Sequence, residues 1–138
     1  MYKELIEGHL PNNEFIRPQP PAAPEQIEKA EVELGCAFPG ELRELLSEVN
    51  GDRYLCFSCR EIVETNKSVR EALAGCYDGL EKLLFVAQNG CGDYYGYEIR
   101  DGGCVSGRIV LWTHETNKTR TAAKSLAEMI TRYYADEI

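Results

Sequence analysis

The side chains of this chain that are best suited to chemistry are His114 and Glu115, together with Asp93. A histidine beside a carboxylate can act as a general base, as in a small hydrolase, and Asp93 could lie close to His114 across a predicted sheet of antiparallel strands. Neighbouring residues on a strand point to opposite faces, so His114 and Glu115 converge only where a strand ends. We therefore expect no catalytic residue and no enzyme, and keep a His114–Asp93 hydrolase as the lesser alternative.

Asp93 has a second, structural interpretation. It follows the glycine-rich segment Asn89-Gly90-Cys91-Gly92, where an aspartate commonly accepts backbone N–H groups of the turn. A direct contact with a partner is the other possibility. The same segment has neither the lysine nor the following helix that a phosphate-binding loop needs.

The six cysteines include one closely spaced pair, Cys56 and Cys59. A structural zinc site requires four ligands, and the other cysteines do not form closely spaced pairs. They are Cys36, Cys76, Cys91 and Cys104. A redox dithiol is also disfavoured, because no strand-to-helix junction is recognisable around the pair. We expect small buried hydrophobic side chains, with no metal and no cofactor.

The charge balance of 15 basic against 23 acidic residues gives a net charge of −8. Such a surface repels nucleic-acid phosphates and anionic membranes, and it attracts a basic protein. Solubility alone is the alternative reason for the charge. The charged N-terminus and the lack of an apolar run of about 20 residues favour a cytoplasmic protein.

The elements that position these residues form a predicted meander of three antiparallel strands. Phe85 to Ala87, Asp93 to Ile99 and Val105 to His114 read as strands, joined by the Asn89–Gly92 turn and by a hairpin at Asp101-Gly102-Gly103. Alternation places Tyr95, Tyr97 and Ile99 on one face and Tyr94, Glu98 and Arg100 on the other. One face should meet helices, and the other should be partly open.

Helices are expected on both sides of the meander in sequence. Pro24 opens one that stops at Gly35, and Pro39 opens a second that ends at Asn50-Gly51. Weaker patterns predict helices over Met1–Leu10 and Ser68–Ala74, a turn or one helical turn over Asp78–Lys82, and a short edge strand over Tyr54–Phe57. A polar loop over Thr116–Arg120 should precede a C-terminal helix carrying Ala122, Leu126, Ile130 and Tyr133.

This order predicts the α+β class, with a mostly antiparallel sheet packed by an N-terminal helical hairpin and a C-terminal helix. The proline-rich stretch Pro11–Pro24 reads as an extended connector that lies along the domain. We expect residues 1–23 to form a helix and a proline-rich arm, and residues 24–138 to form a single domain.

Three motifs in the right order resemble the SUKH superfamily, named for a yeast cell-wall-synthesis regulator of the Smi/Knr type and related bacterial proteins. The first runs Glu31-x-x-Leu34-Gly35-x-x-Phe38-Pro39-x-x-Leu42-x-x-Leu45-Leu46 and closes at Asn50-Gly51. The second is Phe85-x-Ala87-x-Asn89-Gly90-x-Gly92-Asp93. The third is Ile109-x-x-Trp112-x-His114-Glu115. The resemblance covers about residues 24 to 135 and leaves out the proline-rich arm and the Cys56–Cys59 region.

What the resemblance implies is binding and not catalysis. Bacterial SUKH proteins are similar to immunity proteins, which bind and neutralise a toxin domain, often a nuclease, whereas fungal relatives resemble regulatory scaffolds. An immunity protein is the leading hypothesis, and an intracellular scaffold is the alternative. The partner would be a protein, with neither nucleic acid nor membrane bound directly.

We expect the partner to bind to an acidic and aromatic surface. Tyrosine and tryptophan supply large contact areas, and carboxylates steer a basic partner. The residues predicted to contact the partner are Asp52, Asp93, Tyr94, Glu98, Asp101, Trp112 and Glu115. The alternative for Tyr94 and Trp112 is that both are packing residues of the core.

Overall fold

An antiparallel sheet organises the fold in the computed structural model, which describes residues 1–100, 103–104 and 107–138. Its strands are β1 (Leu83–Gln88), β2 (Tyr94–Arg100), β3 (Gly103–Cys104), β4 (Ile109–Thr113) and β5 (Lys118–Ala123). They follow the order β1-β2-β4-β5, and β3 pairs with β2. The predicted antiparallel meander and the α+β class are confirmed. The predicted hairpin residues Asp101 and Gly102 lie outside the described residues.

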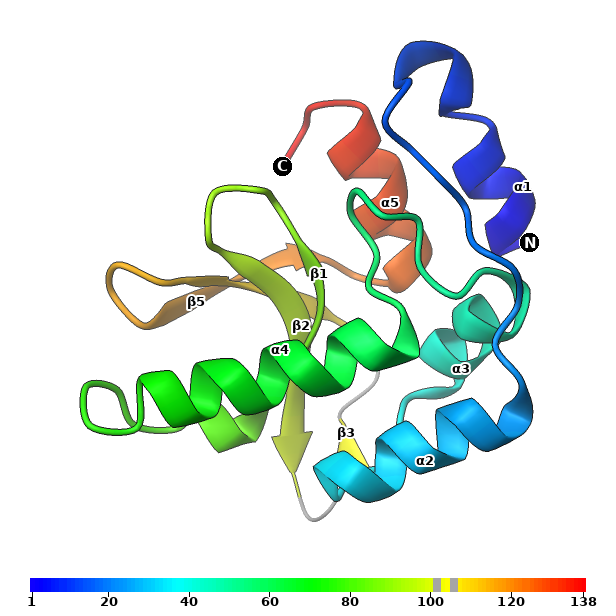
Figure 1. Cartoon of the computed structure of the whole chain (residues 1–138). Helices are drawn as coiled ribbons and strands as arrows, with labels where there is room; N and C mark the ends of the chain where they lie inside the picture. Colours follow the sequence, from blue (N-terminus) through cyan, green and yellow to red (C-terminus); the bar gives the residue numbers. More distant parts are fainter. Residues whose placement is uncertain (101–102, 105–106) are drawn as a thin grey trace.

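Five α-helices and two short 3-10 helices surround this sheet. They are α1 (Tyr2–Glu7), η1 (Leu10–Asn12), α2 (Pro24–Leu34), α3 (Gly40–Glu48), α4 (Cys59–Ala72), η2 (Leu80–Lys82) and α5 (Leu126–Tyr134). In Figure 1, α4 crosses the sheet on one side. Helices α1, α3 and α5 lie together on the right of this view, away from the turn that leads into β5. None of the helices in the described ranges is long and apolar enough to cross a membrane.

Both faces of the sheet carry buried side chains, and the face of Tyr94 and Trp112 is partly open, as expected, because Thr119 and Thr121 of β5 are exposed on it. On one face, Tyr95 packs edge-on against Tyr133 of α5, and the Tyr97 hydroxyl donates to Glu41 of α3 at 2.7 Å. On the other face, Phe85 and Trp112 are each only 1% exposed. Both rings pack against the half-buried Tyr94 on that face.

The helical hairpin of α2 and α3 forms as predicted, because the signals at both of its ends are strong. Gly35 ends α2 with φ 68°, a left-handed conformation that glycine adopts without steric cost. The apolar stripe of α3 buries Leu42, Leu45 and Leu46. The buried Glu31 of α2 accepts the Phe38 N–H at 2.6 Å and pairs with Arg43 of α3, which ties the two helices together.

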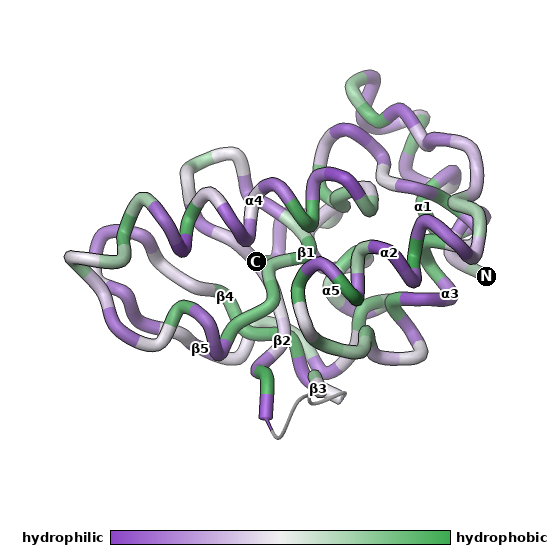
Figure 2. The backbone as a smooth tube through the Cα atoms, turned by 60° about the horizontal axis from the view of Figure 1, so that its bottom comes forward, coloured by the Kyte–Doolittle hydropathy of each residue, from purple (hydrophilic) through white to green (hydrophobic). Residues whose placement is uncertain are grey.

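Helix α4 is longer than predicted and begins earlier, at Cys59. Ser58 caps it, accepting the Glu61 N–H at 3.1 Å, while the Glu61 side chain accepts the Ser58 N–H at 2.9 Å. Its buried residues are Cys59, Ile62 and Asn66, so a polar side chain occupies the apolar stripe. Figure 2 shows hydrophobic and hydrophilic residues alternating along this helix. That interrupted pattern hid the first half of the helix from sequence analysis.

Asn66 is buried because it takes the place of a neighbouring strand for β1. Its amide nitrogen donates to the Phe85 carbonyl at 2.9 Å, and its amide oxygen accepts the Phe85 N–H at 2.8 Å. Both backbone groups of Phe85 are thereby satisfied from the helix.

Strand β5 was not predicted. Ala122 and Ala123 end this strand instead of opening a helix, and α5 starts later, at Leu126, behind the cap Ser125. The segment predicted as a polar loop supplies the first residues of β5, since Lys118 pairs with Thr113. The predicted edge strand over Tyr54–Phe57 is reduced to one isolated bridge between Cys56 and Ala87.

The proline-rich arm lies along the domain and contributes to its core. Ile16 is fully buried and Ala22 is 5% exposed. Backbone bonds fasten the arm, from Arg17 N–H to the Asp52 carbonyl at 2.8 Å and from Ala22 N–H to the Leu46 carbonyl at 2.9 Å. The arm is therefore packed in place along its length.

Candidate partner-binding surface

The turn between β1 and β2 is joined to the end of β4 by Asp93. Its Oδ1 accepts the His114 backbone N–H at 3.0 Å and lies 2.6 Å from the ring Nδ1 of His114. The imidazole rests against Gly92, where a Cβ atom would lie 3.1 Å from the ring. The predicted approach of Asp93 to His114 is therefore confirmed, and a side chain at position 92 would displace the histidine.

These contacts change the acidity of Asp93. Burial raises its pKa, but hydrogen bonds from the His114 backbone, the His114 ring and Asn89 outweigh that effect and leave the pKa below its usual value. The carboxylate is thus the form that the fold favours. His114 Nε2 makes no hydrogen bond to any described residue, and no group of three or more metal-ligating side chains forms within the described ranges.

Tyr94 and Trp112 stack on one another with ring centroids 6.0 Å apart and planes 8° apart. The Trp112 side chain is 1% exposed, and its indole N–H donates to Asn117 at 2.8 Å. Tyr94 also packs on Phe85, at 5.1 Å, and is half-buried. Trp112 is a core residue, and we leave it out of the proposed binding surface.

Asp52 was predicted on an acidic rim, but its side chain is fully buried. The loop after Gly51 folds around this carboxylate, which accepts the backbone N–H groups of Tyr54, Leu55 and Cys56 at 3.0, 2.8 and 2.9 Å. Its other oxygen accepts the Tyr134 hydroxyl. Asp52 therefore has a structural role and offers no surface to a partner.

The carboxylate of Glu98 is matched by arginines. Arg108 donates to it through Nε at 2.9 Å, and Arg100 lies 3.6 Å away. The hydrogen bond from Arg108 lowers the pKa of Glu98 despite an opposing effect of burial. Glu115 is exposed, and Asp101 lies outside the described residues. The structure thus brings Asp93, Tyr94 and Trp112 together but does not gather the predicted acidic residues into one patch.

The remaining motif residues shape the backbone around this sheet. Gly51 has φ 86°, and a Cβ atom there would lie 2.7 Å from the Ser58 nitrogen, so glycine is required where the loop meets α4. The Asn50 side chain accepts the Cys59 N–H at 2.8 Å. The others are Leu34 beside Gly35, the buried Phe38 and Pro39, and Asn89, Gly90 and Gly92 in the β1–β2 turn.

The cysteine pair sits at the start of α4, a junction that sequence analysis did not recognise. Burial raises the pKa of both the Cys56 and the Cys59 thiols, so neither is a ready thiolate. The prediction of small buried side chains is correct for these two and for Cys36, and wrong for the exposed Cys76 and Cys91. Cys36 and Cys104 meet with their sulfurs 3.8 Å apart, and both are free thiols.

An aromatic surface that sequence analysis missed lies where the arm meets the end of α5. Phe15 is 64% exposed and stacks on Tyr54, which is 37% exposed, with ring centroids 6.3 Å apart. Tyr54 in turn stacks on Tyr134 at 6.2 Å. In the sequence, the signals for this surface are an aromatic residue within the arm, Phe15, and the adjacent Tyr133 and Tyr134. These residues come from segments far apart in the chain.

Negative charge gathers on the helical part of the molecule. Residues 1–64 carry 13 acidic and 6 basic side chains, whereas residues 94–124 carry 3 acidic and 5 basic ones. Glu25 and Glu28 of α2 and Glu44 of α3 are exposed and form no ion pair with a described residue. The helices, and not the sheet, supply the acidic surface.

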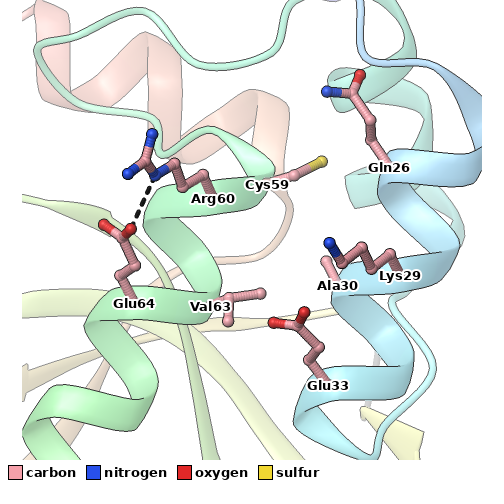
Figure 3. A pocket seen from close by; sticks show the side chains of 8 residues that line it. All are labelled: Gln26, Lys29, Ala30, Glu33, Cys59, Arg60, Val63 and Glu64. Carbon is pink, nitrogen blue, oxygen red and sulfur yellow. Dashed lines mark hydrogen bonds and ion pairs between the residues drawn. The ribbon is translucent and has the colours of Figure 1, made fainter.

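The groove between α2 and α4 is of mixed charge. Figure 3 shows a hollow, of about 360 Å³, with Lys29 and Glu33 on its α2 side, and with Arg60 and Glu64 on α4 extending away from α2. Arg60 and Glu64 are paired at 2.8 Å. A groove with both signs in alternation selects neither an acidic nor a basic ligand.

Comparison with known proteins agrees with this arrangement. Residues 21–132 match the model of the SMI1 / KNR4 family (SUKH-1), a range that begins at the end of the proline-rich arm and ends within α5. No curated protein matches the chain. The matched range covers most of the 138 residues, and the chain therefore belongs to the SMI1 / KNR4 family (SUKH-1).

Proposed function

We propose that this protein is an immunity-type binding protein, which neutralises a basic toxin domain by forming a stoichiometric complex with it. The observation that carries the proposal is the concentration of unpaired carboxylates on the helices of a chain in this family. Such a surface raises the association rate of a cationic partner and disfavours acidic ones. Neutralisation would follow from covering the active site or substrate groove of the toxin, without any reaction by the protein itself.

The test begins with affinity capture by the tagged protein at low salt and elution at high salt, from the lysate and secretions of the source organism. A charge-reduced variant, Glu25→Gln/Glu28→Gln/Glu44→Gln, serves as a matched bait, since these side chains are exposed and form no ion pair with a described residue. It should retain the fold and recover less of the partner. The variant offers fewer exposed carboxylates to a cationic protein, and salt screens the attraction that remains.

The captured protein is then purified, and its activity is titrated with the immunity candidate. Loss of toxic activity with an end point at one-to-one stoichiometry is the expected result. A captured partner whose activity is unchanged at molar excess, or recovery of metabolic and signalling enzymes alone, would overturn the proposal in favour of a regulatory scaffold.

A further inference from the structure

The surface around Tyr54 contains two adjoining hollows, which we call together the aromatic hollow. They measure about 320 and 470 Å³ and share Asn12, Asn13 and Tyr54 in their walls. The lining residues come from the proline-rich arm, from Tyr54 in the loop after Asp52, from the β1–β2 turn and from the end of α5. Figure 1 shows α1, the arm and α5 side by side in this region.

The rings in this hollow form a row. Phe15 and Tyr54 are 12° from parallel, and Tyr54 and Tyr134 are 24° from parallel. His9 continues the row beyond Tyr134 with its centroid 5.1 Å away, and Tyr133 lies at 59° to Tyr54. Phe15 and Tyr54 are two of the few large apolar side chains that the molecule exposes. Exposed rings in a cluster mark an interaction site more often than scattered ones do.

The hollow is held in position before any ligand arrives. The Tyr134 hydroxyl donates to the buried Asp52, and the Tyr133 hydroxyl donates to the Asn89 carbonyl at 3.2 Å. Asp52 also accepts the backbone N–H of Tyr54. Because these bonds fix the rings of Tyr133 and Tyr134 and the backbone of Tyr54, binding costs little ordering of these residues.

The acidic side chains that line the hollow are not matched by a lysine or arginine in its lining, although the Arg17 guanidinium lies nearby and donates to the Glu14 and Ile16 carbonyls. Glu14 and Asp136 are exposed carboxylates in its two walls, and no described lysine or arginine lines either part. Three other hollows on the surface each include at least one such cation, namely Arg60, Arg53 and Arg43. The aromatic hollow therefore combines ring faces with carboxylates and lacks the cation found in the others.

We propose that the aromatic hollow receives an arginine side chain of a basic protein partner. A guanidinium group is planar, stacks on tyrosine and phenylalanine faces, and donates in a fork to a carboxylate, so Glu14 or Asp136 would accept from it while a ring covers its plane. A lysine would satisfy the charge but not the stacking. The inference rests on the proposed function only in taking the partner to be a basic protein.

The test needs no knowledge of the toxin. The capped tripeptide Gly-Arg-Gly is titrated into the isotope-labelled full-length protein, and amide chemical shifts are followed by NMR. The expected result is saturable shifts confined to Asn12–Phe15, Tyr54, Asn89 and the end of α5. The same tripeptide with citrulline, which keeps the shape and loses the charge, should produce none of these shifts.

Two variants locate the interaction and leave the core untouched. Phe15→Ala and Asp136→Asn should each weaken the tripeptide about two- to fivefold, as expected for one exposed cation–aromatic or charged contact. Val32→Ala, which trims another highly exposed apolar residue on α2, and Glu81→Gln, which removes an exposed carboxylate of η2, are the matched controls and should change nothing.

Equal shifts from the citrulline peptide, or shifts spread over the acidic helices α2 and α3, would overturn the proposal. This outcome is separate from that of the proposed function. A toxin that is neutralised by the Phe15→Ala and Asp136→Asn variants as well as by the unchanged protein would leave immunity standing and place its contact elsewhere.

Discussion

A single buried carboxylate, Asp52, connects three parts of the molecule. It accepts three successive N–H groups of its own loop, and through the Tyr134 hydroxyl it holds the end of α5. The arm is attached to the same residue, since Arg17 N–H donates to the Asp52 carbonyl at 2.8 Å. The walls of the aromatic hollow thus depend on an aspartate that is itself hidden.

Replacing this carboxylate should therefore be costly. Asp52→Ala leaves three backbone N–H groups without their acceptor, and we expect the free energy of unfolding to fall by about 3 kcal/mol. Tyr134→Phe removes only one of the four bonds and should cost about 1 kcal/mol. Urea unfolding followed by circular dichroism measures both. Equal losses for the two variants would show that the loop does not depend on Asp52.

The Asp93–His114 contact makes stability depend on pH in the acid range. The pKa of Asp93 is lowered in the folded protein, so its stabilising effect is complete above the unfolded-state value of about 3.9 and is lost as the pH falls through the lower folded-state pKa. We expect Asp93→Asn to be less stable than the unchanged protein at about pH 5, with the gap closing towards about pH 3. Thermal unfolding across this range tests it, and a gap that widens on acidification contradicts the assignment.

Among the elements, the pairing of β2 with β1 depends on the close approach of the two strands at Gly96. A Cβ atom on Gly96 would lie 2.1 Å from the Leu84 carbonyl oxygen, which is a backbone atom that cannot turn aside. The two strands are paired through this position, since Gly96 faces Phe85 in the register. The glycine is needed here for space, and its lack of a side chain interrupts the row of tyrosines.

Gly96→Ala should accordingly force the strands apart and lower the free energy of unfolding by about 3 kcal/mol, the upper end for overpacking in a core. Gly40→Ala is the matched control, because nothing lies within 4 Å of a Cβ atom at the start of α3. That substitution should be neutral or slightly stabilising. Chemical denaturation of both variants decides the matter, and tolerance of alanine at position 96 would refute the close approach.

The elements predicted correctly are those whose signals are local. Helix α3 has a regular apolar stripe behind Pro39, and β1 and β2 are joined by a turn in which Gly90 and Gly92 adopt positive φ. Helix α4 was half missed because Asn66, a polar residue, fills the buried position that serves Phe85, a contact between residues 19 positions apart. Strand β5 was missed because its sequence, KTRTAA, is polar and exposed over its first four residues.

The binding surface was predicted less well for the same reason. Alternation along β2 identifies which residues share a face of the sheet. It does not identify which helices or loops pack on each face. Asp52 is held by the distant Tyr134, and Trp112 packs on Phe85 of another strand. Glu98 is paired with Arg108 across the turn that follows β2. The aromatic hollow joins Phe15, Tyr54 and Tyr134, which no spacing rule connects.

At the scale of the whole molecule, charge is divided between the two ends. The helices carry most of the unpaired carboxylates, and the β4–β5 side carries Arg108, Lys118, Arg120 and Lys124. A cationic partner approaching this dipole is turned towards the helices, where the aromatic hollow also lies. The basic end then faces away from such a partner, and its charges need another explanation.

Strand β5 supplies that explanation, because it ends the sheet. Within the described residues it pairs with β4 alone, and the Ala122 carbonyl near its end accepts from Arg132. Its first residues therefore form a sheet edge that another strand could join. Lys118 and Arg120 are exposed on this strand, and charged side chains on an edge oppose pairing between molecules.

Lys118→Val/Arg120→Val would leave an uncharged run of valine, threonine and alanine, which favours β structure. We expect this variant to self-associate more strongly than the unchanged protein, as measured by sedimentation velocity over a concentration series. Lys118→Glu/Arg120→Glu keeps charge of the other sign at the same positions and should behave like the unchanged protein. If the valine variant sediments unchanged at all concentrations, the two cations do not protect the edge.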